Sequence, residues 1–219
     1  MEDYKNMTSE SAKPELQVKK KHIVREYAES IIIAVILALI IRTFIVQAFK
    51  IPSGSMEDTL AIGDHILVSK FIYGTQIPFT STRLLKIRDP RRGDVIVFEY
   101  PEDPSKDFIK RVIGTPGDTI QVIDKKVYVN GKLYENPHEV HKEKDVIPKE
   151  QNPRDNTDLI TVPTNAYFVM GDNRDRSYDS RFWKFVRNDQ IKGLAFIKYW
   201  SWDKENFGVR WRSIGKLID

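Results

Sequence analysis

An apolar segment near the N-terminus constrains this chain more than any other feature of its sequence. Eleven apolar residues run without interruption from Ile31 to Ile41, which as a helix would cover only about 16 Å. Extended from Tyr27 to Phe49, the segment reaches about 34 Å, against a hydrocarbon core of about 30 Å. The sequence therefore predicts one membrane-spanning helix over residues 27–49.

Arg42 is a charge inside that segment. It lies close enough to the C-terminal end at Phe49 for its long side chain to reach the membrane interface. Two other interpretations are a buried core helix and a cleaved targeting peptide. A cleaved peptide fits poorly, because no small-x-small cleavage site follows the apolar run.

Basic residues directly precede the segment, at Lys19, Lys20, Lys21 and Arg25. By the positive-inside rule they place the N-terminus in the cytoplasm and everything after the segment outside it. We therefore expect a cytoplasmic tail (1–26), a transmembrane anchor (27–49) and an extracytoplasmic domain (50–219).

Composition excludes several kinds of protein. The 35 Lys and Arg residues are nearly balanced by 31 Asp and Glu, so the chain lacks the strong single-sign charge of nucleic-acid binders, and we expect no nucleic-acid partner. The sequence has no cysteine, which excludes disulfides, thiolate catalysis and cysteine-ligated metal.

The pattern changes after Phe49 to short apolar or alternating stretches closed by Gly, Pro, Asn or Asp, which is typical of strands. The predicted strands are 65–69, 94–100, 108–113, 119–123, 126–129, 166–170 and 194–200. Asn130-Gly131 predicts a hairpin, because these residues tolerate the positive φ of a type I′ turn. Residues 135–158 are polar and predict an exposed connection or the edge of a small β extension, inserted at about 118–165.

A candidate nucleophile follows the apolar segment almost at once. Ser55 lies in the turn-forming sequence Ile51-Pro52-Ser53-Gly54-Ser55-Met56. The usual base for a serine is histidine, but His22 falls on the cytoplasmic side, and His138 and His141 lie in the polar connection. His65 remains an alternative base, although a structural role at the start of a strand explains it more simply.

Lys110 is the other candidate base. A strand at 108–113 places Phe108, Lys110 and Val112 on one face. Burial among apolar neighbours disfavours the charged ammonium and lowers a lysine pKa by up to several units from about 10.4. Lys110 is therefore a candidate general base, with an edge-strand lysine whose head reaches water as the alternative.

A dense polar loop at 169–181 is the third notable window. Its Asp and Arg residues alternate, and such residues more readily pair with one another than bind a cation. We expect a charge-paired structural loop, with no metal and no cofactor.

Together the three windows resemble the bacterial type I signal peptidases, membrane enzymes that remove signal peptides from exported proteins. The resemblance rests on Pro52-Ser53-Gly54-Ser55-Met56 with Gly63-Asp64, on Arg92-Gly93-Asp94 through Lys110-Arg111 to Pro116-Gly117-Asp118, and on Gly171-Asp172-Asn173-Arg174-Asp175 to Ser180-Arg181. It implies a mainly β, signal-peptidase-like core that carries a small β extension and follows one transmembrane helix.

The resemblance also implies roles for individual residues. Ser55 would be the nucleophile, Lys110 its base, Ser53 an oxyanion donor and Ser177 a residue that orients Lys110. The residues implied to hold the loop are Asp172, Arg174, Asp179 and Arg181. Those implied to line shallow substrate pockets for small P1 and P3 residues are Phe49, Ile51, Pro52, Ile66, Val97, Phe108 and Ile109. The implied substrates are preproteins with Ala-x-Ala-like sites, and the implied partners are membrane lipid and the protein-export machinery.

The chain departs from the family pattern at Asp58, where proline is common, and at Arg176, where a small polar residue is common. Trp200 and Trp202 are either interfacial anchors or core residues. Two other functions remain open: a self-cleaving serine–lysine protease of the SOS-repressor type, and a non-catalytic β domain tethered to the membrane.

Overall fold

A computed structural model describes residues 20–76, 83–84 and 86–219. The chain divides into two compact units, Met1–Leu39 and Ile40–Asp219. Most of the predicted cytoplasmic tail, residues 1–19, lies outside the described residues.

Helix α1 (Lys20–Ile40) provides the described residues of the N-terminal unit, and its last residue, Ile40, begins the second unit. From residue 23 to residue 40 every side chain is exposed, although most of them are apolar. A helix that is apolar on all sides is typical of a membrane span. Ile23–Ile45, 23 residues in length, is long and apolar enough to cross a membrane.

The predicted helix over 27–49 is wrong at its C-terminal end. Helical backbone finishes with a π-helical turn at Ile41–Ile45, and Val46–Lys50 forms strand β1. β1 pairs antiparallel with β2 (Asp64–Ser69), with Phe49 opposite Ile66. A short apolar run fits either a helix or a strand period. Pairing with β2 gives the backbone N–H and C=O groups of Val46–Lys50 hydrogen-bond partners in the second unit.

A large antiparallel sheet forms the body of the second unit, in the order β1-β2-β13-β5-β6-β11-β12, with β14 paired to β13. Its further strands are β5 (Val95–Tyr100), β6 (Asp103–Gly114), β11 (Ala166–Met170), β12 (Val186–Arg187), β13 (Ile191–Asp203) and β14 (Gly208–Val209). A separate pair joins β3 (Thr75–Gln76) to β4 (Arg83–Leu84). The prediction of a mainly β fold is confirmed.

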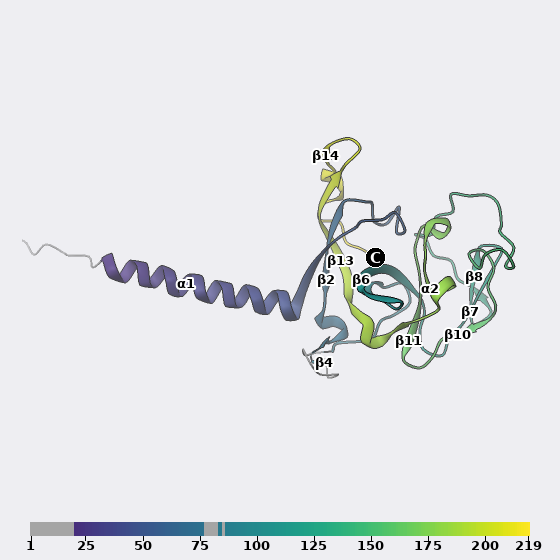
Figure 1. Ribbon diagram of the computed structural model, residues 1–219, viewed down its shortest axis with the longest axis horizontal. Helices are drawn as coiled ribbons and strands as arrows, with labels where there is room; N and C mark the ends of the chain where they lie inside the picture. The colour runs from purple at the N-terminus through teal and green to yellow at the C-terminus, as the bar shows by residue number, and fades with distance from the viewer. Residues whose placement is uncertain (1–19, 77–82, 85) are drawn as a thin grey trace, which may run out of the picture. The chain divides into compact units, whose positions relative to one another are not determined.

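A second, four-stranded sheet has the order β10-β7-β8-β9. Its strands are β7 (Thr119–Ile123), β8 (Lys126–Val129), β9 (Lys132–Leu133) and β10 (Ile160–Thr161), all between 118 and 165. Figure 1 shows β7, β8 and β10 beyond β11, on the side away from β2 and β13. Asn130 and Gly131 both have positive φ, of 52° and 74°, and form the predicted turn between β8 and β9.

Three apolar clusters fill the second unit. One lies on the face of the large sheet that carries Ile96, Phe98 and Val112, and it also includes Trp183 of the short helix α2 (Ser180–Trp183). Another contains Ile51, Met56, Leu60, Ile66, Val97 and Ile109. The third joins β6 and β11 to the smaller sheet.

The polar stretch 135–158 is less exposed than a simple surface connection. Asn136, Arg154, Asp155 and Thr157 within it are buried. Asp155 accepts hydrogen bonds from the Arg154 guanidinium and from the Ile147 N–H. The connection therefore folds back on the body through paired charges.

Candidate active site

Strand β6 places Lys110 in the interior. Its antiparallel neighbour β5 sets Ile96 directly opposite Lys110, and Phe98 opposite Phe108. Because opposed residues share a face of the sheet, the lysine stem lies on the apolar face that Ile96 and Phe98 help to form. Only 4% of Lys110 is exposed.

Burial determines the charge state of Lys110. Loss of solvent is the largest cause that lowers the pKa of this lysine, from 10.5 to about 8, against the opposing charge of Asp179. About a tenth of the molecules therefore carry a neutral amine at pH 7, and about half at pH 8. A neutral amine has the lone pair that a general base needs.

The Ser55 segment is fixed by its neighbours in the chain. The Met56 and Leu60 side chains are fully buried, and the Leu60 N–H donates to the Met56 carbonyl at 2.7 Å. Ahead of the segment, the Ile51 N–H donates to the Asp64 carbonyl at 2.8 Å. A turn held at both ends by buried apolar side chains and backbone hydrogen bonds presents Ser55 in one position.

Ser55 and Lys110 meet although 55 residues separate them. The Lys110 Nζ lies 2.8 Å from the Ser55 Oγ and 2.9 Å from the Ile109 carbonyl oxygen. Both side chains are buried. This is the nucleophile–base distance that general-base activation of a hydroxyl requires.

Gly171, at the end of β11, allows two chain segments to approach the serine. A Cβ at this position would lie 2.4 Å from the Ser55 carbonyl oxygen and 2.3 Å from the Ser177 Oγ. Asn173 follows, and its N–H donates to the same Ser55 carbonyl at 3.2 Å. The loop after β11 thus fixes the backbone of the nucleophile.

Ser177 is buried in this loop, but the structure gives it other partners than Lys110. Its Oγ accepts a hydrogen bond from the Gly171 N–H at 3.1 Å, and a hydrogen bond to Asp179 contributes to the lowered pKa of that carboxyl. Among the described residues, the hydrogen-bond partners of the Lys110 Nζ are Ser55 and Ile109. The expected hydrogen bond between Ser177 and Lys110 is therefore not found among the described residues.

The charged residues of the loop pair with one another and with β6. Asp172 accepts two hydrogen bonds from Arg111, each of 2.8 Å, and Asp179 pairs with Arg181 at 2.8 Å. The Arg174 Nη1 lies 2.9 Å from Glu139 without hydrogen-bond geometry. All four loop residues expected to hold the loop are buried.

Sequence reasoning assigned no partner to Arg111, which the structure buries beside Lys110. Besides Asp172, its Nη1 donates to the carbonyls of Gly93 and Asp219, each at 2.8 Å. Asp172 in turn accepts from the Thr59 hydroxyl at 2.6 Å. This pair joins the segment that carries Ser55 to the strand that carries Lys110.

An open cleft of about 460 Å³ contains the Ser55 and Lys110 side chains. Of the expected pocket residues, Pro52, Phe108 and Ile109 line it. Phe49, Ile51, Ile66 and Val97 instead belong to the apolar cluster behind the cleft, where the last three are buried. They support the cleft from behind and do not face it.

Ser53 also lines this cleft and is exposed. Within the described part of the chain, neither its hydroxyl nor the Ser55 N–H donates a hydrogen bond to a protein group. Both donors belong to residues that line the cleft.

His65 has a structural environment. Its ring lies edge-on to Tyr199, with 5.9 Å between the ring centres, and Nδ1 lies 3.2 Å from the Gly63 carbonyl oxygen. Within the described residues, no group of three or more His, Cys, Asp or Glu side chains is arranged to hold a metal ion.

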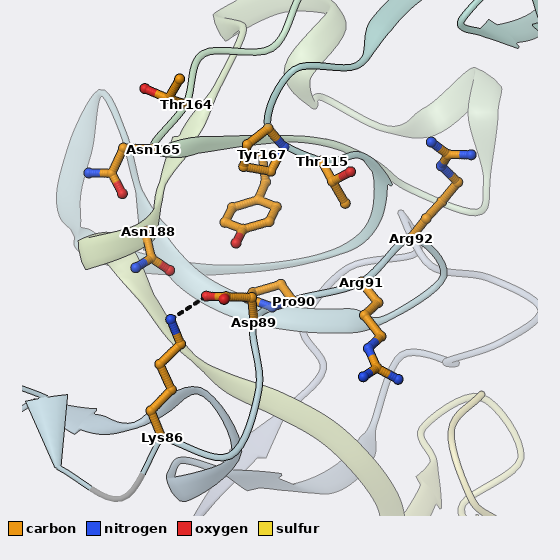
Figure 2. A pocket seen from close by; sticks show the side chains of 11 residues that line it. Lys86, Asp89, Pro90, Arg91, Arg92, Thr115, Thr164, Asn165, Tyr167 and Asn188 are labelled. Atoms are coloured by element: carbon orange, nitrogen blue, oxygen red, sulfur yellow. Dashed lines mark ion pairs between the residues drawn. The ribbon is translucent and has the colours of Figure 1, made fainter.

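A second cavity, of about 650 Å³, lies elsewhere in the body (Figure 2). Lys86 at its edge pairs with Asp89 at 2.5 Å, and Arg92 pairs with Asp118 at 2.9 Å. Its lining includes the hydroxyls of Thr115 and Thr164 but neither Ser55 nor Lys110. Although this cavity is larger, the nucleophile–base pair lies in the other cleft.

Comparison with known proteins decides the family. The family model described as signal peptidase, peptidase S26, matches residues 24–200. The chain belongs to this signal peptidase family. The match includes Ser55, Lys110 and the loop at 171–181, and it confirms the resemblance drawn from the sequence.

Two signal peptidase relatives agree with this assignment. Signal peptidase I of Pseudomonas aeruginosa is 39% identical over 215 residues, covering 85% of this chain and 76% of that protein. Signal peptidase I of Aquifex aeolicus is 36% identical over 228 residues, covering 81% and 84%. A crystal structure of a signal peptidase I from Enterococcus faecalis V583 is 31% identical, with a TM-score of 0.39, and covers 49% of this chain and 97% of that one.

Family membership makes the chain a peptide-bond hydrolase of the serine peptidase kind. It also decides between the functions that the sequence left open, because neither a repressor-type autoprotease nor a non-catalytic β domain accounts for this match.

Proposed function

We propose that this chain is a membrane-anchored signal peptidase that uses Ser55 as nucleophile and Lys110 as general base to cleave exported preproteins. The observation that carries the proposal is the 2.8 Å contact between the Ser55 Oγ and the Lys110 Nζ. Burial supplies the second requirement, because the pKa of Lys110 is lowered to about 8 and the amine is partly neutral at physiological pH.

The chemistry follows from these two atoms. The neutral Lys110 amine takes the proton of the Ser55 hydroxyl as the Oγ bonds to the scissile carbonyl carbon. The resulting ammonium then gives that proton to the departing amine, and an acyl-enzyme ester remains on Ser55. A water molecule, deprotonated by Lys110, attacks the ester and releases the signal peptide with a free carboxylate.

Two donors from residues of the cleft support stabilisation of the oxyanion. Ser53 presents a hydroxyl in the cleft, and the Ser55 N–H is the neighbouring backbone donor. A donor aimed at the developing negative charge is worth about 10²- to 10³-fold in rate. The cleft wall formed by Pro52, Phe108 and Ile109 is apolar, which favours small uncharged residues at P1 and P3, as in Ala-x-Ala sites.

The proposed topology combines the helix and the charges that precede it. Ile23–Ile45 spans the membrane, and Arg42 lies three residues from its C-terminal end, where its side chain reaches the interface. The basic residues Lys19, Lys20 and Lys21 then hold the N-terminus in the cytoplasm. The catalytic body lies outside, where signal peptides emerge from the export machinery.

Lipid is a further proposed partner, and exposed aromatic residues support it. Trp211 is 73% exposed and lies edge-on to Trp200, while Phe207 between β14 and β13 is 83% exposed. Trp202, which the sequence also offered as an anchor, is only partly exposed. Tryptophan, with its polar N–H, favours the membrane interface, and the exposed Phe207 adds apolar surface beside it, so we place this surface against the bilayer.

The test is cleavage of a preprotein with an Ala-x-Ala site by the full chain in detergent. Wild type should release the signal peptide, and Ser55→Ala should be inactive. Lys110→Arg should also be inactive, because arginine keeps its charge and cannot accept the serine proton.

Lys132→Ala serves as a matched control, since Lys132 is an exposed lysine in the hairpin of the smaller sheet. It should cleave at the wild-type rate. Equal cleavage by Ser55→Ala and wild type would refute the proposed nucleophile.

A further inference from the structure

Arg176 differs electrostatically from the other charged groups of the catalytic cleft. Four charged side chains line that cleft: Glu57, Asp107, Lys110 and Arg176. Glu57 pairs with Lys142 at 2.6 Å, and Asp107 pairs with Lys192 at 2.7 Å.

Lys110 is buried against Ser55 and is the proposed base. Arg176, in contrast, is exposed. Within the part of the chain that the structure describes, the Arg176 guanidinium has no ion pair and no hydrogen bond. The backbone N–H of Arg176 donates to the Asn173 carbonyl at 3.2 Å. The cleft therefore presents one guanidinium to whatever binds there.

The surrounding charges do not neutralise this cation. Glu57 is near enough that Arg176 contributes to its lowered pKa, but Lys142 is the larger cause. The group Glu57, Lys142 and Arg176 thus carries one net positive charge. The Asn173 side-chain amide also donates a hydrogen bond to the Glu57 carboxylate, at 3.2 Å, so this carboxylate has Asn173 as a partner as well as Lys142.

The chain position of Arg176 ties this charge to the reacting atoms. It directly precedes Ser177, whose Oγ binds the Gly171 N–H. Gly171 in turn approaches the Ser55 carbonyl so closely that it leaves no room for a Cβ. Arg176 therefore extends from a loop that is fixed against the nucleophile, and its mean position relative to Ser55 is set by that loop.

We propose that Arg176 is a specificity-determining residue that favours an acidic side chain in the preprotein next to the scissile bond. This inference rests on the proposed function. In an extended peptide, side chains alternate between two sides, so when P1 and P3 face the apolar wall, the side chains of P2 and P1′ point the other way and are free to meet Arg176. An acidic residue there forms an ion pair, and a basic residue is repelled.

The test uses peptides that share one Ala-x-Ala site and carry Glu, Gln or Lys at P2 or P1′. Cleavage is measured with the full chain in a zwitterionic detergent without anionic lipid. At one of these positions, wild type should prefer Glu over Gln by about two- to fivefold in kcat/KM, mainly through KM, which is the range of an exposed ion pair. High salt should reduce the preference.

Charge reversal separates recognition from a structural effect. Arg176→Glu should reverse the order, so that the Lys peptide becomes better than the Glu peptide at the same position. Lys132→Glu, which makes the same change in net charge far along the chain in the hairpin of the smaller sheet, should keep the wild-type preference. The preference is the ratio of the kcat/KM values of two peptides with the same variant, so any general loss of activity cancels.

Two results would overturn the inference while leaving the proposed function intact. One is that wild type and Arg176→Glu cut all peptides but show the same order of preference at every position. The other is that Arg176→Glu differs from wild type only after anionic vesicles are added, which would assign Arg176 to lipid headgroups. If wild type cuts no peptide, or Ser55→Ala cuts as well as wild type, the proposed function fails and the inference fails with it.

Discussion

Arg111 and Asp172 form a buried bidentate ion pair, with Nε to Oδ1 and Nη2 to Oδ2 distances of 2.8 Å each. Their side chains are only 2% and 1% exposed. Arg111 follows the proposed base in β6, and Asp172 follows Gly171 and binds the Thr59 hydroxyl of the Ser55 segment. The pair therefore holds together the elements that bring Ser55 to Lys110.

Asp172→Ala should destabilise the folded body by about 3–5 kcal/mol, because it leaves the Arg111 guanidinium buried without its carboxylate. Chemical denaturation of the full chain in detergent measures this loss. Lys106→Ala, which breaks the exposed pair between Lys106 and Asp103, should change the free energy of unfolding by no more than about 1 kcal/mol. A similar small change for Asp172→Ala would contradict the structural role of the buried pair.

Gly171→Ala should lower kcat by about 10²-fold or more, the scale expected when reacting groups are displaced by about 1 Å. The added methyl would lie 2.4 Å from the Ser55 carbonyl oxygen, so the nucleophile or the loop must move. Steady-state kinetics on the Ala-x-Ala peptide measures the effect.

Gly208→Ala is the matched substitution, because its added Cβ would meet only an ordinary contact among the described residues beyond its chain neighbours, the Asn206 carbonyl oxygen at 3.7 Å. It should keep the wild-type kcat. If Gly171→Ala kept the wild-type kcat too, the close approach of Gly171 to Ser55 would not matter for catalysis.

Lys110→Met should stabilise the protein near pH 7 while it abolishes activity. The pKa of Lys110 is about 8 in the folded chain against 10.5 for an exposed lysine, a difference that corresponds to roughly 3 kcal/mol of unfavourable charge burial. Methionine has a similar length and no charge to bury. Thermal unfolding of both proteins in the same detergent measures the gain.

The pH dependence of that gain has a definite sign. Between about pH 8 and 10.5 the unfolded chain holds a proton on Lys110 that the folded chain has lost, so wild-type stability rises with pH across this window. The advantage of Lys110→Met should therefore be full below about pH 8 and shrink above it. An advantage independent of pH would mean that Lys110 is not buried as an ionisable group.

Much of the fold could be predicted because local signals were strong. The hairpin at Asn130-Gly131 follows from two residues that tolerate positive φ, and both adopt it. The alternation in 108–113 correctly placed Lys110 with Phe108 and Val112 on an apolar face. These predictions need only the two-residue period of a strand.

Features that depend on long-range contacts could not be predicted. Val46–Lys50 continues an apolar run and becomes a strand only because β2 is available to pair with it. Lys125 reaches Asp175 at 2.6 Å, and the N–H groups of Lys142 and Glu143 bind the same carboxylate. Such contacts between distant polar segments leave no periodic signal in the sequence.

In the candidate site, too, local features could be predicted and long-range contacts could not. Ser55 and Lys110 could be named from local sequence and family resemblance, but their 2.8 Å contact needed the fold. The pocket residues were less predictable, because an apolar residue near the site either lines the cleft, as Ile109 does, or supports it from behind, as Ile51 does. Sequence pattern does not distinguish those two positions.

The pH dependence of kcat/KM tests Lys110 as the general base, since it reports the ionisation of the base in the free enzyme. With an uncharged Ala-x-Ala peptide and the full chain in detergent, log kcat/KM should rise by about one per pH unit below pH 7 and level off above an apparent pKa near 8. That slope is the expected signature of one proton leaving Lys110. A rate that stays constant between about pH 6 and 9 would contradict Lys110 as the general base.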